Sequence, residues 1–337
     1  MTGYRGRRYR KTGRLWSALF SLMTGCFFLL VCLWGSGHFN LLLSDNAEQQ
    51  DISKDVTDGN ADLETTVSDN FISDDVLSDD TFMEEPVWEV HCIDVGQASA
   101  TLIISGEYVM LADTGNKEDA NLILNYLAEQ EVTELDYLLL THPHEDHIGA
   151  AARILREIPV DRVLMPEIGI DMCETVCYAE LLSAIEEKEP ITDYPKAGDV
   201  YSLGEMSFTV VCPNPEWQPV KEDINESSLG VHISDGERSI LLYGDGKQYC
   251  EAYMTEQQEI AADILIVGHH GSSYSSSAAF LEAVNPKYAV ISCGKDNDYG
   301  FPHGAVLDRL AVVGAEVFRT DELGTIVFLC DGKNITF

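Results

Sequence analysis

Basic residues are scarce in this 337-residue chain, which has 21 Lys and Arg against 57 Asp and Glu and a formal net charge of −36. The imbalance persists in residues 87–337, where 14 basic and 43 acidic residues leave a net charge of −29. Proteins that bind nucleic acids through a broad basic face rely on Lys and Arg to neutralise phosphates. The composition therefore argues against such a face, although it leaves local cleavage of a phosphodiester open.

Paired cysteines are also lacking. Two of the nine cysteines lie in an apolar run near the amino terminus, seven lie in residues 87–337, and no Cys-x-x-Cys motif occurs. An odd number outside that run does not make a disulfide framework. We expect most of these cysteines to be small buried hydrophobic residues. Cys173 and Cys177, four apart on a predicted helix, fit packing as well as a bridge.

The amino terminus has the pattern of a membrane anchor. Residues 1–14 contain six Lys or Arg and no acid, and the run from Leu15 to Trp34 carries no charge. Such a run is long enough to span a bilayer as a helix, and its basic flank places the amino terminus in the cytoplasm. We therefore expect a cytoplasmic tail over residues 1–14 and a single-pass signal anchor over residues 15–36 in the cell membrane, with the rest of the chain extracellular.

Cleavage is the alternative to anchoring. Gly35-Ser36-Gly37 offers a tolerable signal-peptidase site, and cleavage there would make the protein secreted, although the uninterrupted apolar length favours an anchor. A lipoprotein site at Cys26 is disfavoured because the apolar run continues beyond it. Residues 37–86 are acidic and poor in aromatics, which predicts a disordered linker. Residues 87–337 would then form one domain.

The most informative segment is Thr141–His147, which reads Thr-His-Pro-His-Glu-Asp-His. It follows the apolar segment Leu135–Leu140, so it lies at the carboxyl end of a predicted strand, where α/β proteins usually build their sites. Imidazoles and carboxylates this close need a shared partner if they are buried. Nitrogen and oxygen ligands at such spacing suit Zn²⁺ or a similar divalent ion. A solvated polar loop would explain one or two His, but it explains His-x-His-x-Asp-His poorly.

Strand-like and helix-like patterns alternate over residues 87–337, which predicts an α/β domain. Strands are expected at Trp88–Asp94, Ala100–Ile104, Tyr108–Asp113, Tyr137–Thr141, near Val163, Phe208–Val211, Gly230–Ile233, Ile240–Tyr243, Ile264–Val267, Ala289–Ser292, Glu316–Phe318 and Thr325–Leu329. Helices are expected at Ala120–Glu129, Ala150–Glu157, Cys173–Glu187, Ser275–Val284 and Ala305–Val313.

Further motifs accompany the His-rich run, in the order Ile93–Gln97, Leu111–Gly115, Tyr243–Asp245, Gly268–Ser272 and Gly300–His303. With that run, they make residues 87–337 resemble the metallo-β-lactamase superfamily. The chain most closely resembles the hydrolase domain of the competence protein ComEC family and the teichoic-acid phosphorylcholine esterases. This resemblance implies an αββα sandwich of two mixed sheets with helices outside. The chain departs from the family where Ala98-Ser99 follow Gln97, since Gly-Asp is usual there.

The resemblance also implies a site with two metal ions, Zn²⁺ or Mn²⁺. It assigns His142, His144 and one of His269 and His270, with His269 favoured, to metal one, Asp146, His147 and His303 to metal two, and Asp245 to both as a bridge. The other member of the His pair would face substrate or support the ligands. Asp113 resembles a carboxylate that orients a ligating His, and Asp94 either supports the same layer or caps its strand. His232, within a predicted strand, is expected to pack rather than bind metal.

The implied activity is hydrolysis of a phosphodiester-type bond, in DNA or in a phosphorylated cell-envelope polymer. Asp146, Asp245 and His270 are the expected catalytic residues, acting on a metal-activated water. Lys295 and Asn297 could hydrogen-bond a substrate phosphate, although a solvated loop is the favoured interpretation. Hydrolysis of a β-lactam is disfavoured because no intermediate His other than His232 is present. A non-enzymatic envelope- or DNA-binding accessory module with the same fold is the remaining alternative.

Overall fold

The computed structural model describes residues 87–257 and 259–337. The predicted tail, signal anchor and acidic linker (residues 1–14, 15–36 and 37–86) lie outside the described residues and stay predictions. Within the part of the chain that is described, no helix has the length and apolar character needed to cross a membrane.

Two β-sheets form the centre of the described chain. The first has eight strands in the order β15 (Ile335–Thr336), β14 (Ile326–Cys330), β1 (Trp88–Cys92), β2 (Thr101–Ser105), β3 (Tyr108–Ala112), β4 (Leu135–Leu139), β5 (Val160–Leu164) and β6 (Ile191–Asp193). The second has seven, in the order β13 (Glu316–Arg319), β12 (Tyr288–Ile291), β11 (Ile264–Ile266), β10 (Ser239–Leu242), β9 (Gly230–Ser234), β8 (Met206–Cys212) and β7 (Val200–Leu203).

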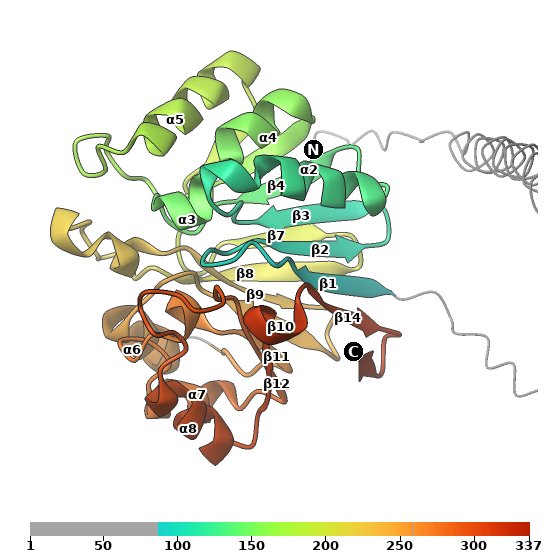
Figure 1. Ribbon diagram of the computed structural model, residues 1–337, viewed down its shortest axis with the longest axis vertical. Coiled ribbons are helices and arrows are strands. Elements are labelled where there is room, and N and C mark those ends of the chain that lie inside the picture. Colours follow the sequence, from blue (N-terminus) through green and yellow to red (C-terminus); the bar gives the residue numbers. More distant parts are fainter. Residues whose placement is uncertain (1–86, 258) are drawn as a thin grey trace, which may run out of the picture. The chain divides into compact units, whose positions relative to one another are not determined.

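Helices cover the outer face of each sheet. They are α2 (Ala120–Glu129), α3 (Glu145–Ile148), α4 (Ala151–Glu157), α5 (Val176–Lys188), α6 (Gln248–Gln257), α7 (Ala278–Val284), α8 (Gly304–Val312) and α9 (Thr320–Leu323), with short 3₁₀ segments η1 (Lys117–Asp119), η2 (Lys221–Ser227) and η3 (Gly268–Gly271). Figure 1 shows α2, α4 and α5 on one side of the paired sheets and α6, α7 and α8 on the other.

Three buried clusters hold these layers together. The central cluster joins the facing sides of the two sheets and includes Trp88 and Phe208. Alternation along β1 explains this, because Trp88, Val90 and Cys92 point into the cluster while His91 points to the opposite face. Burying a large apolar side chain contributes about 1.5–3 kcal/mol. The paired sheets therefore stabilise each other across their shared face.

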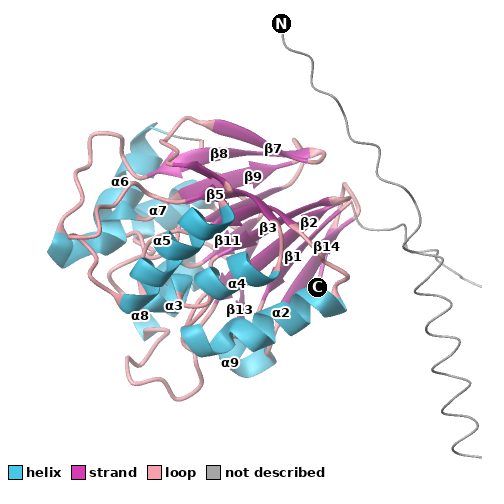
Figure 2. Ribbon diagram, turned by 90° about the horizontal axis from the view of Figure 1, so that it is seen from above, coloured by secondary structure: helices cyan, strands magenta, loops and turns pink. Residues whose placement is uncertain are grey.

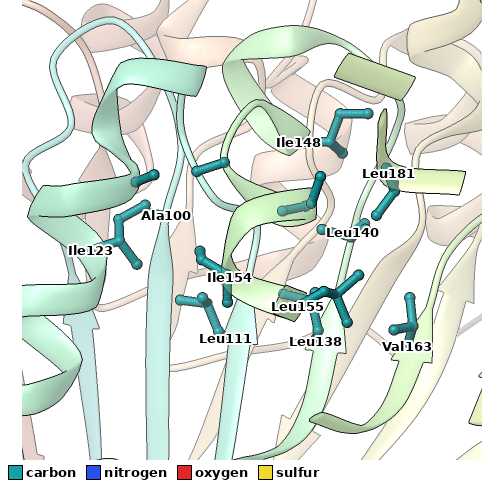
Figure 3. Close-up of a cluster of buried hydrophobic side chains, with 14 of the residues drawn as sticks. Ala100, Leu111, Ile123, Leu138, Leu140, Ile148, Ile154, Leu155, Val163 and Leu181 are labelled. Atoms are coloured by element: carbon teal, nitrogen blue, oxygen red, sulfur yellow. The ribbon is translucent and has the colours of Figure 1, made fainter. Parts of the chain in front are cut away.

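The two outer clusters attach the helices. Under α2, α4 and α5, side chains such as Ile123, Ile154 and Leu181 belong to one buried cluster with Leu111 and Leu138 of the first sheet (Figure 3). A matching cluster lies between α6, α7, α8 and the second sheet. The layers are thus helix, sheet, sheet, helix, and the predicted αββα sandwich is confirmed.

The end of the sheets where parallel strands finish is the end that carries the motifs. β3 and β4 run parallel in the first sheet, and β10, β11 and β12 run parallel in the second, so their carboxyl ends reach a common edge in each sheet. Long loops gather there, opposite the short hairpin turns such as the one between β2 and β3 (Figure 2). This is the edge at which a site was expected.

Some predicted elements were wrong or missing. The helix expected from Cys173 begins at Val176, because the Thr175 side-chain oxygen accepts a hydrogen bond from the Tyr178 amide and caps the first turn. Cys173 therefore lies outside the helix. Strands β6, β7 and β15 and helices α3, α6 and α9 were not predicted. All seven cysteines of the described residues are buried free thiols, as expected for most of them.

Candidate metal centre

The His-rich run leaves β4 and turns directly into a short helix. His144 is the last residue before α3, so Asp146 and His147 lie in the first turn of that helix. The apolar residues of β4 anchor the strand in the core, and the polar run begins only after Thr141. The strand thus fixes where the run begins, and α3 turns Asp146 and His147 back beside His142.

Asp113, at the end of β3, organises this run. Its carboxylate accepts hydrogen bonds from the Thr141 amide (2.8 Å) and hydroxyl (2.9 Å), and its Oδ2 lies 2.7 Å from His147 Nδ1. Asp113 adopts a positive φ of 59°, a conformation that Asp tolerates better than most residues. The structure places Asp113 on the ring nitrogen of His147 that faces away from the site, a position from which it can orient that ring.

Asp245 enters from the second sheet, after β10. Gly244 makes this approach possible, because a Cβ at that position would lie 2.6 Å from the Thr141 side chain. Its φ of +53° also favours glycine. The Asp245 amide donates to the Ser228 hydroxyl (3.2 Å), which fixes the start of the loop. Asp245 is 4% exposed, so its carboxylate is held in the interior of the site.

Glu226 fixes the other end of the same loop. Its carboxylate accepts hydrogen bonds from the amides of Lys247, Tyr249 and Cys250, at 3.2, 3.0 and 2.9 Å, around the start of α6. A carboxylate at a helix amino terminus accepts hydrogen bonds from unpaired N–H groups, and its negative charge is stabilised by the positive end of the helix dipole. Glu226 thereby holds in place the segment that follows Asp245.

His269 and His270 lie in the η3 turn after β11. Both have φ near +54°, a left-handed conformation that is uncommon for His and is maintained by the surrounding structure. His270 Nδ1 lies 2.9 Å from the Ser292 carbonyl oxygen, to which it donates, and its Nε2 faces the Asp146 carboxylate. This strained turn lets two consecutive imidazoles reach different parts of the site.

Four side chains form one compact group, the second donor set: Asp146, His147, His270 and Asp245. One ligand atom from each lies within 4.8 Å of all the others. His270 Nε2 is 3.2 Å from Asp146 Oδ2, and His147 Nε2 is 3.1 Å from Asp245 Oδ1. The group brings together two imidazole nitrogens and two carboxylates, a donor combination suited to Zn²⁺ or Mn²⁺.

The other carboxylate oxygen of Asp245 faces the first donor set, which comprises His142, His144, His269 and this oxygen. Asp245 Oδ2 lies 3.9 Å from His142 Nε2 and 3.7 Å from His269 Nε2. His144 Nδ1 lies 3.0 Å from His142 Nε2. One carboxylate thus lies between two groups of donors, and the bridging role expected for Asp245 stays a prediction.

Orphaned buried atoms test whether these residues fit a metal ion. His147 Nε2 and Asp245 Oδ1 are buried, and although they lie 3.1 Å apart, neither makes a well-aligned hydrogen bond among the described residues, and His269 Nδ1 makes none either. Buried polar atoms without partners cost about 1–3 kcal/mol each. A divalent ion would satisfy the first two atoms at once, and the donors around them fit such an ion.

The charge state of the rings differs between the two sets. Burial lowers the pKa of His142, His144 and His269, which favours neutral rings. Burial acts in the same direction on His147 and His270, but the nearby carboxylates outweigh it and raise the pKa of both. The carboxylates of Asp245, Asp113 and Asp146 cause the rise at His147.

The imidazole rings also shift the pKa values of the carboxylates beside them. Burial alone would raise the pKa of Asp146 and Asp245, but His147 and His270 hold both values below the ordinary Asp range. Both groups are therefore ionised and available as ligands at neutral pH. The cavity beside them is lined in part by Asp113, His147, Asp245, His269 and His270.

His303 and Asp94 do not join the site in the way that was predicted. His303 Nδ1 accepts a hydrogen bond from the Ser273 amide (3.0 Å) and its ring packs against Phe301, and the second donor set contains His270 instead. The Asp94 side chain accepts from the Gly96 amide (3.1 Å), a local turn that agrees with the capping alternative.

His232 lies outside both donor sets, and several residues that support the site carry no sequence motif. His232 Nε2 contacts the Ala261 carbonyl (2.9 Å), away from the donor sets, as expected. Sequence reasoning missed Ser292 and Asn225, whose Nδ2 is 3.5 Å from His269 Nε2. It also missed Glu226. A backbone carbonyl and a distant helix cap leave no motif in the sequence, so no pattern pointed to Ser292 or Glu226.

Comparison with protein families matches residues 93–295 to the metallo-beta-lactamase superfamily. The chain is 31% identical over 268 residues to ComE operon protein 3 of Bacillus subtilis, covering 74% of this chain and 34% of that protein. It is 32% identical over 249 residues to Recombination protein 2 of Haemophilus influenzae, covering 72% and 29%. The chain therefore spans about a third of the length of these curated relatives.

Among solved structures, the metallo-beta-lactamase fold protein YhfI from Bacillus subtilis is similar to 72% of this chain over 99% of its own length. The sequence identity is 16% and the TM-score 0.48.

Proposed function

We propose, from the premise that this chain belongs to the metallo-beta-lactamase superfamily, that residues 87–337 are a dinuclear metal-dependent hydrolase of phosphodiester-type bonds. Members of this superfamily are generally metal-dependent hydrolases. The observation that carries the proposal is Asp245, whose two carboxylate oxygens face two separate groups of imidazole donors. A buried carboxylate in this position is expected where two ions are held side by side.

We assign one ion to each donor set. His142, His144 and His269 would hold the first ion and Asp146, His147 and His270 the second, with Asp245 shared. His270 thus takes the place that the sequence resemblance gave to His303. The identity of the ions is proposed as Zn²⁺, with Mn²⁺ as the alternative, because imidazole and carboxylate donors suit both.

The protein's own residues prepare the site for this chemistry. When bound, divalent ions supply Lewis acidity and lower the pKa of a water toward neutrality. Asp113 and the Ser292 carbonyl each accept from the Nδ1–H of a ring, so Nε2 of His147 and Nε2 of His270 are directed into the site and can bind an ion once the proton on Nε2 has left. Such hydrogen bonds behind the rings fix the orientation of both rings before any ligand binds.

The phosphodiester class rests on similarity to competence and recombination proteins, with DNA or a phosphorylated cell-envelope polymer as substrate. We place the domain outside the cell membrane, held by the predicted anchor at residues 15–36. Protease added to intact cells should remove the domain and leave a membrane-bound stub. Recovery of a soluble mature form that begins near Gly37 would show cleavage instead.

The test of the activity uses the purified full chain. Metal-free protein is reconstituted with Zn²⁺ or Mn²⁺, its metal content is measured, and turnover is followed on a chromogenic phosphodiester, single-stranded DNA and a phosphorylcholine ester. Two ions per chain and metal-dependent turnover of at least one substrate are expected. Absence of bound metal would sink the proposal. Binding of two ions without turnover of any of the three substrates would favour a non-enzymatic module.

A further inference from the structure

Three nearly parallel aromatic rings lead from the second donor set to the surface. The His270 ring faces Phe301 with centroids 6.5 Å apart and planes at 19°, and Phe301 faces Tyr299 at 5.3 Å and 15°. Tyr299 is 66% exposed. We call these three rings the aromatic stack. It begins at a proposed metal ligand and ends on an exposed tyrosine.

The loop that carries Tyr299 and Phe301 is held by the side chain of Asn297. Asn297 Nδ2 donates to the carbonyls of Gly294 (2.9 Å) and Phe301 (2.7 Å), and Asn297 Oδ1 accepts from the Phe301 amide (2.9 Å). The side-chain amide of Asn297 is therefore used within the loop rather than for a substrate phosphate. A platform fixed before binding avoids much of the ordering cost of association.

The charges beside the stack leave one lysine available. Arg319 is paired with Asp321 and Glu322. Lys295 is exposed, lines the same hollow as Phe301 and has no ion pair among the described residues. With a domain charge of −29, binding of a polyanion here must depend mainly on contacts other than with phosphates.

We propose that the outer face of Tyr299 binds a nucleobase of a single-stranded polynucleotide whose backbone reaches the metal centre. This rests on the proposed hydrolase function and selects one of its substrate classes. Bases stack on aromatic rings in a sequence-tolerant way, and only an unpaired strand offers a free base face. A quaternary ammonium group is instead bound by several ring faces arranged as a cage. The parallel rings of the stack present one flat outer face, which fits a planar ligand.

The experiment compares two strands of equal length in the metal-loaded full chain. One is an oligothymidylate, and the other carries abasic residues on the same phosphodiester backbone. Tyr299→Ala should lower the preference for the oligothymidylate, measured as the ratio of kcat/KM values, roughly tenfold through KM. Affinity for the oligothymidylate, measured by fluorescence anisotropy, should fall by a similar factor.

Two variants control for shape and for general surface change. Tyr299→Phe keeps the ring and should keep the preference. Tyr274→Ala removes a tyrosine of matching exposure, 67%, that stacks on no ring among the described residues, and it should leave the preference unchanged. An equal loss with Tyr274→Ala would overturn the assignment to Tyr299.

The outcomes separate the subsite from the activity. If neither strand is cleaved but Tyr299→Ala still weakens binding of the oligothymidylate, the subsite stands and the hydrolase proposal fails. If both strands are cleaved and Tyr299→Ala changes neither the preference nor the affinity, the subsite is wrong and the hydrolase proposal survives. Loss of turnover on a phosphorylcholine ester, with oligothymidylate unaffected, would identify a quaternary ammonium as the occupant and overturn the nucleobase.

Discussion

The two donor sets share Asp245 but are built differently. In the second set, His147 is held by Asp113 and His270 by the Ser292 carbonyl. In the first set, His142 Nδ1 lies 3.2 Å from the Thr141 hydroxyl, whereas His269 Nδ1 is buried and has no hydrogen-bond partner among the described residues. Both rings of the second set are therefore oriented by hydrogen bonds behind them, whereas His269 of the first set lacks one.

The difference in support goes with a difference in charge. The rings of the second set stand among three carboxylates, which raise the pKa of His147 and His270, whereas burial lowers the pKa of the rings in the first set. Protons are thus held in the second set until an ion displaces them. The second donor set, with oriented and charged rings, should therefore respond differently to mutation and to pH from the first donor set, whose rings are neutral.

The largest effect is expected from a change at the residue that both donor sets share. Asp245→Ala removes the one group common to both sets, so both ions should be lost or bound more weakly. Turnover should fall by more than about 100-fold, which is the largest loss typical of changes at residues that only hydrogen-bond to a metal ligand. Metal analysis and kinetics on the same preparation measure this. His232→Ala, at a His outside both sets, should keep two ions. Retention of both ions by Asp245→Ala would refute the bridging role.

The next effect should be confined to one set. His270→Ala removes one of four donors from the second set, so metal content should drop from two ions to about one while the first ion stays. His303→Ala is the matched control, because His303 contacts Ser273 and Phe301 instead. If metal analysis shows that His303→Ala loses an ion and His270→Ala keeps both, the ligand assignment from the sequence was correct.

A smaller effect should come from the residue that orients a ligand. Asp113→Asn keeps an oxygen near His147 but removes the charge, so affinity for the second ion should fall about 10- to 100-fold with little change in the first. Equilibrium dialysis with Zn²⁺ gives both affinities. Asp94→Asn, at a side chain that accepts from the Gly96 amide in a local turn, should change neither. An equal loss at both positions would mean that Asp113 acts on the fold as a whole.

The smallest effect is a difference in pH dependence. A raised His147 pKa stabilises the metal-free fold below the ordinary His value of about 6.5, and this contribution is lost as pH rises through the raised pKa. A metal ion needs the neutral ring, so the second ion should weaken as pH falls, by up to about tenfold per unit for one displaced proton. The first set, with lowered pKa values, should weaken only at lower pH. Metal titrations at several pH values would show two separate profiles.

Much of this site could be predicted because its residues follow strands. His142 to His147 follow β4, Asp113 follows β3 and Asp245 follows β10, and strand ends are recognisable from apolar runs that stop at polar residues. The sandwich fold followed from the same alternation together with the family resemblance. Residues that follow a recognisable strand could therefore be singled out as site candidates from local pattern alone.

The proposed exchange of His303 for His270 could not be predicted in that way. Which donor set a ring reaches depends on the backbone conformation, and the positive φ of both His269 and His270 has no sequence signature in non-glycine residues. Helix α6 was missed for a related reason. Its apolar face is small, with Cys250 and Met254 buried, and its cap is supplied by Glu226 from a preceding segment.

The single carboxylate between the donor sets would also make the two proposed ions thermodynamically dependent on each other. Whatever free energy the first ion adds to, or removes from, the binding of the second through Asp245, the second must return to the first in equal measure. Asp245, which faces both donor sets, is therefore one route by which loading of one ion affects loading of the other. The order in which ions arrive changes the path to the loaded protein but leaves its total stability the same.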